Sequence, residues 1–292
     1  MARDAGTGEM GIACHSQAFA VGSSVPWALP GYGAVATQSM GEPMYGELGL
    51  DTLRGGLTAA EALTALRSVD RHPERRQVGM VDGQGNFAAY TGDACVGAAG
   101  HRFGKGCVAL ANMVTSEDVW VAMVESFERS SGRLPDRLVA ALHAAEAAGG
   151  DIRGERSAAI LVVRAERTGR PWRDQIVDIR VDDHPAAVAE LSRLVTHSAR
   201  YHVMVHAFER ALDGQVDRAQ ELLETVEPPD PATEGDLSMW RAVILGLAGR
   251  TDAAREQLRE LEKASPEFVE AVTRFRTAGL VDDPTLFDRI LP

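Results

Sequence analysis

The sequence predicts an α+β protein in two parts: a layered domain over residues 1–198 and a small all-α helical-hairpin domain over residues 199–292. Three observations predict this. Strand and helix signals come in separate groups along the first part, the strand signal stops near Pro185, and a 35-residue repeat follows. Grouped strands favour packed layers over a strictly alternating parallel fold. We therefore expect two sheets with a pair of helices on each outer side, a four-layer αββα sandwich.

The expected strands are short runs of small or apolar residues bounded by glycine or polar residues. They cover residues 9–16, 32–39, 76–82, 86–91, 107–114, 157–163 and 175–181. The first two runs are expected to be neighbouring strands joined by a long loop rich in glycine and proline. A Gly-Gln-Gly turn at residues 83–85 predicts a hairpin between the third and fourth runs.

Helices are expected in two pairs between these strands. The first pair comprises residues 45–54, which end at a Gly-Gly stop, and a helix that opens at Thr58. Glu61 follows Thr58 at the spacing of a capping box, in which the two residues satisfy each other's backbone N–H groups. The second pair covers residues 116–129 and 135–148.

The helical part beyond Pro185 contains an internal repeat. Residues 214–223 (GQVDRAQELL) align with residues 249–258 (GRTDAAREQL) at an offset of 35 residues. A period near 34 residues with a Gly-x-x-Asp-x-Ala corner is typical of tetratricopeptide-like helical hairpins. Two units are fewer than such stacks usually need. We therefore expect these helices to lean on the main domain or on another subunit, and a homo-oligomer, most simply a dimer.

Composition excludes several classes of partner. The formal net charge of −12 argues against nucleic acid and against anionic membranes. No apolar run is long enough to span a membrane, and the three cysteines have no paired spacing. Reduced thiols predict a cytoplasmic protein. No cofactor and no metal site are expected, because His202 and His206 share a helix face without a third ligand.

Polar residues at strand ends form the candidate site. We expect catalytic roles for Ser16, Asn112, Asp151 and Arg153. We expect substrate contacts from His15, Thr37, Gln38, Ser39, His101 and Ser157. An amide side chain can stabilise an oxyanion, and an Asp–Arg pair can hold a carboxylate or an amine.

Each of these candidates has a structural alternative. Thr37 and Ser39 could instead cap the helix that follows them, and the Asp151–Arg153 pair could only fix a turn. Ser16 and His15 could be packed within the sheet, and a lone histidine such as His101 is often structural. Cys14 is a weaker candidate nucleophile, because buried cysteines are usually inert.

Several motifs resemble the bacterial family catalogued as domain of unknown function 1028. They are ARD-x-x-TGE-x-G, AVGS-x-VPWA, GAVATQS, RRQVG-x-VD, YTG-x-x-C, GGDIRGERSAAILVV and VDDHP, spread in order over residues 2–195. The resemblance implies the fold of the N-terminal-nucleophile hydrolases. These enzymes cleave amide bonds with the side chain of the first residue of the mature chain, and the free α-amine of that residue acts as base. Relatives often carry a C-terminal helical region linked to peptidoglycan binding, and residues 199–292 are similar to it.

This sequence differs from the family at its start. Relatives have a short apolar strand ahead of Ala-Arg-Asp, with threonine or a similar residue right after the start methionine, whereas here Met1 directly precedes Ala2. We expect the start to be placed about five residues late, so that the nucleophile lies just upstream of Ala2. The other interpretation is that the protein does not use this mechanism.

The expected function is therefore hydrolysis of amide bonds in a small peptide-like or acylated amine substrate. The alternative is a non-catalytic protein whose pocket binds a ligand and whose helical tail binds a partner or a cell-wall fragment. A weaker third option is a repurposed enzyme that uses Cys14 or Ser16.

Overall fold

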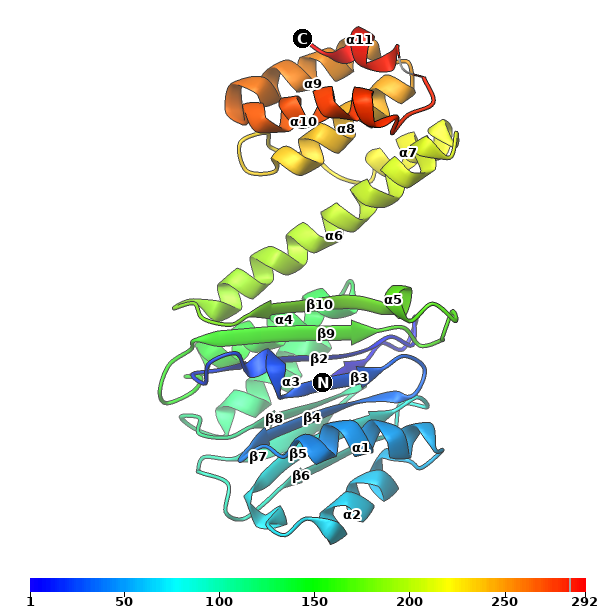
Figure 1. The fold of residues 1–292 in the computed structure, drawn as a ribbon. Coiled ribbons are helices and arrows are strands. Elements are labelled where there is room, and N and C mark those ends of the chain that lie inside the picture. The colour runs from blue at the N-terminus through cyan, green and yellow to red at the C-terminus, as the bar shows by residue number, and fades with distance from the viewer. Residues whose placement is uncertain (284) are drawn as a thin grey trace. The chain divides into compact units, whose positions relative to one another are not determined.

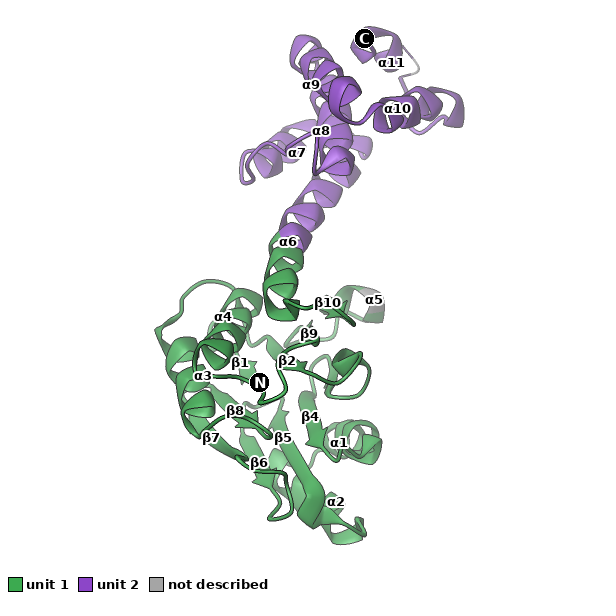
Figure 2. Cartoon of the chain, turned by 90° about the vertical axis from the view of Figure 1, so that its left-hand side faces the viewer, with its two compact units in different colours: residues 1–196 green, residues 197–292 purple. Residues whose placement is uncertain are grey.

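A computed structural model describes residues 1–283 and 285–292, apart from the side chain of Trp172. The chain divides into two compact units, Met1–Thr196 and His197–Pro292 (Figure 2). The sequence placed the division at residue 198. The boundary falls inside the long helix α6 (Ala187–Leu212) and not in a linker. The first unit is a mixed α/β structure with two antiparallel sheets, and the second unit is built from helices (Figure 1).

The larger sheet has six strands in the order β10-β9-β2-β1-β8-β7, and all neighbours are antiparallel. Its strands are β1 (Ala2–Arg3), β2 (Met10–Ser16), β7 (Gly100–Gly104), β8 (Cys107–Ala111), β9 (Ser157–Val163) and β10 (Gln175–Val181). The central strand β1 has two residues, whereas its neighbours β2 and β8 have seven and five. The facing edges of β2 and β8 therefore continue past the end of β1.

The smaller sheet has four strands in chain order: β3 (Pro26–Leu29), β4 (Gly33–Ser39), β5 (Arg76–Asp82) and β6 (Phe87–Thr91). The hairpin predicted at residues 83–85 joins β5 to β6. The prediction that residues 9–16 and 32–39 form neighbouring strands is wrong, because β2 and β4 belong to different sheets. The expected loop between them contains the short helix η1 (Val21–Ser23) and β3, which pairs with β4.

Helices cover the outer face of each sheet, as Figure 1 shows. Helices α1 (Pro43–Arg54) and α2 (Ala59–Val69) share an apolar cluster with β4 and β5, whereas α3 (Asp118–Arg129), α4 (Leu134–Ala147) and the start of α6 share one with the six-stranded sheet. A third cluster, which includes Met10, Ile12 and Val81, lies between the sheets. The capping box is confirmed: the N–H of Thr58 donates to Oε2 of Glu61 at 2.8 Å. The four-residue α5 (Pro171–Asp174) precedes β10, and η2 (Pro73–Arg75) precedes β5.

The second unit begins within α6 and continues through α7 (Val216–Leu223), α8 (Gly235–Leu247), α9 (Thr251–Ala264), α10 (Pro266–Ala278) and α11 (Leu286–Ile290). The sequence repeat corresponds to two corners of the same geometry. Gly214 and Gly249 both adopt a left-handed conformation, with φ of 75° and 73°, and Ala219 and Ala254 are both fully buried. Within the part of the chain that the structure describes, no helix combines the length and apolarity needed to cross a membrane.

Candidate functional site

A cavity of about 240 Å³ lies in the first unit at the point where β1 stops. Its lining comes from both sides of the six-stranded sheet. Cys14 belongs to the cluster between the sheets, whereas Leu142 comes from the covering helix α4. The cavity therefore passes through the sheet, between residues 13–16 of β2 and residues 110–112 at the end of β8. We call this cavity the slot.

The α-amine of Met1 lies at the end of β1 and is buried. It donates a hydrogen bond of 3.0 Å to the carbonyl of Val108 on β8, so it continues the sheet ladder. Burial lowers the pKa of this amine to about 6, because a charged ammonium loses its hydration there.

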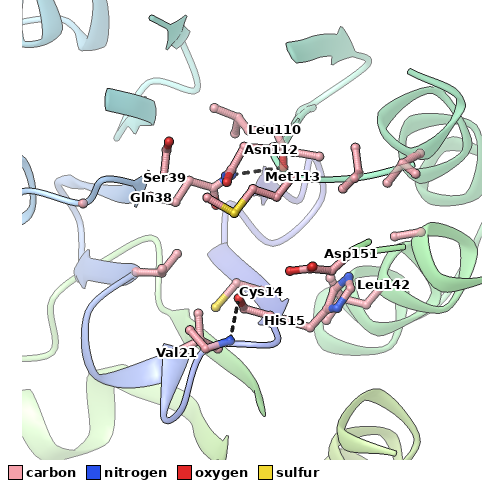
Figure 3. Close-up of a pocket in the computed structure, with 18 of the residues that line it drawn as sticks. Cys14, His15, Val21, Gln38, Ser39, Leu110, Asn112, Met113, Leu142 and Asp151 are labelled. Atoms are coloured by element: carbon pink, nitrogen blue, oxygen red, sulfur yellow. Dashed lines mark hydrogen bonds between the residues drawn. The ribbon is translucent and has the colours of Figure 1, made fainter. Parts of the chain in front are cut away.

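One side of the slot is an amide network centred on Gln77 of β5, which has no exposed surface. Its Nε2 donates to the carbonyls of Gly100 (3.0 Å) and Ala111 (2.9 Å), and these acceptors fix the orientation of the amide. Oε1 of Gln77 therefore accepts from Nε2 of Gln38 at 2.7 Å and from Nδ2 of Asn112 at 3.1 Å. Figure 3 shows Gln38, Ser39 and Asn112 together on this side of the slot.

The amide groups of Gln38 and Asn112 differ in what they can offer a ligand. The Nε2 of Gln38 also donates to the carbonyl of Leu110 at 3.4 Å, so both of its N–H groups have protein acceptors. The Nδ2 of Asn112 has Gln77 as its acceptor among the described residues and keeps a second N–H. Asn112 is therefore the amide donor that remains for a bound carbonyl or oxyanion.

Two residues on this side have backbone conformations that are rare outside glycine. Ser39 has a φ of 68° and Met113 a φ of 55°, and both line the slot. The hydroxyl oxygen of Ser39 is buried and has no hydrogen-bond partner among the described residues. Strained residues and unsatisfied buried polar groups concentrate at functional sites.

The opposite side of the slot carries charge, and Figure 3 shows His15 and Asp151 there. The guanidinium of Arg153 donates to both carboxylate oxygens of Asp151, at 3.0 and 2.7 Å. Burial opposes ionisation of Asp151, but the hydrogen bonds from Arg153 outweigh it and lower the pKa of the carboxyl. The pair is therefore a fixed carboxylate–guanidinium unit.

His15 lies next to Glu146 of α4, with Nδ1 of the ring 3.2 Å from Oε1 of the carboxylate. Burial lowers the pKa of the His15 imidazole and raises the pKa of Glu146, and the negative charges of Glu155 and Asp151 raise the latter further. A neutral imidazole at neutral pH can accept a proton from a substrate or a water molecule.

Most of the residues predicted for the site line the slot. These are His15, Ser16, Thr37, Gln38, Ser39, Asn112, Asp151 and Arg153. Thr37 is also engaged in the turn into α1, where its Oγ1 accepts from the N–H of Glu42 at 3.4 Å. Oγ of Ser16 accepts from the N–H of Ala18 at 3.0 Å.

Ser157 and His101 do not line the slot. Oγ of Ser157 donates to the carbonyl of Ala18 at 2.6 Å and accepts from the N–H of Val21 at 3.0 Å, so it fixes the loop after β2. Nδ1 of His101 is 2.9 Å from Oγ1 of Thr91, which in turn accepts from Gln77. His101 thus reaches the site only through the amide network.

Sequence reasoning missed Gln77, Glu146 and Met113. A glutamine inside the apolar run RQVGMVD was a detectable signal, because a buried amide in a strand needs partners from another segment. Cys14 lines the slot, but burial raises the pKa of its thiol to about 12, so it is not a thiolate at neutral pH. The described residues include no cluster of three or more His, Cys, Asp or Glu side chains that could hold a metal ion.

Comparison with known proteins identifies the family. The family of unknown function DUF1028 matches residues 1–191. The crystal structure of protein SPO2555 from Silicibacter pomeroyi, assigned to DUF1028, is 32% identical and superposes with a TM-score of 0.61. The match covers 68% of this chain and 86% of that one. A search of curated proteins finds no match. With a family match over most of its length and a solved relative of the same family, this chain belongs to the family of unknown function DUF1028.

Proposed function

We propose that the first unit is a four-layer αββα sandwich of the N-terminal-nucleophile type and that it hydrolyses an amide bond in a small peptide-like or acylated amine substrate. The architecture is supported by two antiparallel sheets with an apolar cluster between them and helices on both outer faces. Fold alone does not specify chemistry, so the activity must be argued from the slot.

The observation that carries the proposal is the register of the slot. Ala2 pairs with Gly11 on β2 and with Cys107 on β8. Ser16 lies five residues beyond Gly11, and Asn112 lies five residues beyond Cys107. Met1 occupies the first of these five positions. A strand that continued β1 ahead of Met1 would fill the other four, and its fourth residue, counted back from Met1, would lie between Ser16 and Asn112. Such a strand would bring its first side chain and its α-amine to the polar end of the slot.

The residues around the slot would then have separate roles in an acyl transfer. A hydroxyl or thiol at that position attacks the substrate carbonyl carbon and gives its proton to the α-amine of the same residue. The carbonyl oxygen becomes an oxyanion that accepts from Nδ2 of Asn112, which Gln77 holds in place. The amine leaves with the transferred proton, and water then releases the acyl group. The Asp151–Arg153 pair, which lines the slot, would hold a charged group of the substrate.

Two forms of the protein test this proposal. One carries four residues ahead of Met1, namely threonine followed by three apolar residues, and the matched control begins with alanine instead. Hydrolysis of N-acyl amino acids and dipeptides is followed by release of free amine. We expect turnover from the threonine form alone, and a decrease of roughly 10²–10³-fold in kcat when Asn112→Ala is added.

Intact mass and N-terminal sequencing of the protein from its natural source give an independent check. A first residue with a hydroxyl or thiol side chain supports the mechanism, and a mature chain that begins at Ala2 contradicts it. Equal inactivity of the threonine and alanine forms would favour the alternative, a non-catalytic protein that binds a ligand in the slot. That alternative is supported by the burial of Cys14, the cysteine that lines the slot, because burial raises the pKa of its thiol to about 12 and leaves no thiolate nucleophile at neutral pH.

A further inference from the structure

A second cavity, of about 260 Å³, lies entirely within the second unit. It is formed by the end of α7, the segment after it, α8 and the corner before α9. Three apolar side chains, Leu223, Val226 and Leu245, form part of its lining. Three charged residues, Glu224, Arg241 and Arg250, also line it. We call it the arginine cavity.

The two guanidinium groups in this cavity lack the acidic partners that five other arginines of the unit have, namely Arg200, Arg218, Arg274, Arg276 and Arg289. Arg200 pairs with Glu234 at 2.8 Å and Arg276 with Asp288 at 2.9 Å. Neither Arg241 nor Arg250 makes an ion pair with any described residue. The cavity lining holds these two guanidinium groups and one carboxylate, that of Glu224, so it carries a local excess of positive charge in a chain of net charge −12.

Arg241 is held in a position that keeps this charge in the cavity. Its Nη1 donates to Oε1 of the buried Gln257 at 2.7 Å, which fixes the guanidinium. Burial lowers the pKa of Arg241, and the positive charge of Arg250 lowers it further. A bound anion would relieve both effects, because it would replace lost hydration and offset the repulsion between the two cations.

The helical repeat does not require these arginines. At the 35-residue offset, Arg241 corresponds to His206 and Arg250 corresponds to Gln215. The corner itself depends on the glycine and the buried alanine, which are the same in both copies. The arginine pair is therefore a feature of this cavity and not of the hairpin architecture.

We propose that the arginine cavity binds a small organic monocarboxylate, with its carboxylate on Arg241 and Arg250 and its apolar body against Leu223, Val226 and Leu245. Planar guanidinium groups match the geometry of a carboxylate. Two guanidinium charges and the carboxylate of Glu224 sum to one positive charge, which suits a monoanion. This inference concerns the second unit alone and does not depend on the proposed hydrolase activity.

The test measures binding of isovalerate to the full chain by isothermal titration calorimetry. Isoamyl alcohol, which has the same apolar body without charge, and inorganic phosphate are the comparison ligands. We expect isovalerate to bind in preference to both. Arg250→Gln should weaken binding about tenfold or more, since losing one charge-assisted contact has that scale. Glu224→Gln should tighten binding, because it removes a competing carboxylate.

Arg259→Gln, an exposed arginine on α9 outside the cavity, is the matched control and should leave binding unchanged. Arg241→Gln tests the second cation, but it also removes the hydrogen bond to Gln257 and could disturb folding. Arg250→Gln does not remove that hydrogen bond, so its effect on binding decides the test in that case. Equal binding of the alcohol, tighter binding of phosphate, or an unchanged affinity in Arg250→Gln would each overturn the proposal.

Discussion

The side-chain amide of Asn112 donates a 3.1 Å hydrogen bond to Oε1 of Gln77, a residue of the other sheet with no exposed surface. This contact joins the segment directly after β8 to the start of β5, an interior strand of the four-stranded sheet. It sets the direction of the Asn112 amide, which, unlike that of Gln38, keeps an N–H without an acceptor among the described residues. Gln77, which does not line the slot, therefore holds the amide groups at the polar end of the slot in position.

Replacing Gln77 should be costly even though it does not touch the slot. Gln77→Leu leaves the carbonyls of Gly100 and Ala111 and the amide of Asn112 without their partner. Unsatisfied buried groups of this kind cost about 3 kcal/mol in total. Urea unfolding should show this loss, whereas Gln84→Leu, on the exposed hairpin turn, should change stability little. A small effect of Gln77→Leu would mean that water replaces the amide.

The Asp70–Arg76 ion pair should stabilise the end of β4. Hydrogen bonds from Arg76 lower the pKa of Asp70 from 3.8 to about 2, and its side chain is 4% exposed. A shift of this size corresponds to roughly 2 kcal/mol, present above the unfolded pKa and lost as the pH falls through the folded one. Asp70→Asn should therefore be less stable than wild type near neutral pH, with the gap closing below about pH 3.

The Asp70→Asn substitution should also affect the backbone at the end of β4. Arg76 also donates to the carbonyl of Met40 at 2.6 Å, directly after the strained Ser39. Asp70→Asn should consequently loosen this segment, and faster amide exchange at residues 39–41 would show it. An unchanged gap between variant and wild type across the whole acid range would contradict the ion-pair explanation.

His15 should make the first unit sensitive to mild acid. Burial lowers the pKa of its imidazole below the usual 6.5, so the unfolded chain binds a proton more readily than the folded one. The stability contribution is complete above pH 6.5 and is lost as the pH falls through the folded pKa. His15→Gln should flatten this part of the stability curve measured by urea unfolding.

The three cysteines should react at very different rates. Burial raises the pKa of Cys14 to about 12 and also raises the pKa of Cys107, whereas Cys95 is partly exposed. Iodoacetamide should therefore modify Cys95 first in the folded protein, as read by peptide mass spectrometry. All three should react in urea. Rapid alkylation of Cys14 in the folded state would show that its thiol is activated, and Cys14 would again be a candidate nucleophile.

The first unit should fold without the second. Its apolar cluster ends at Val195, whereas the cluster of the second unit begins at Met204. A chain that ends at Arg200 should keep a cooperative thermal transition and the circular dichroism of a mixed α/β protein. Aggregation of this truncated chain would show that the remaining helices are needed to cover it.

The sequence by itself determined the elements that depend on local pattern. Short runs of small or apolar residues predicted β2, β4, β5, β6, β8, β9 and β10, and the Thr58–Glu61 spacing predicted the start of α2. The motifs over residues 2–195 predicted the family that the comparisons show. These features succeed because each depends on residues a few positions apart, whose spacing reflects the geometry of one helix or strand.

Only the tertiary structure decided which segments meet. β1, β3 and β7 are short or contain glycine or proline, so their pairing with neighbours defines them more than their own pattern does. Placing β2 and β4 in different sheets, seating Gln77 under Asn112, and assigning Ser157 to the loop after β2 all depend on partners distant in the chain. Buried polar groups must find such partners when the core closes, and no local spacing records which ones they find.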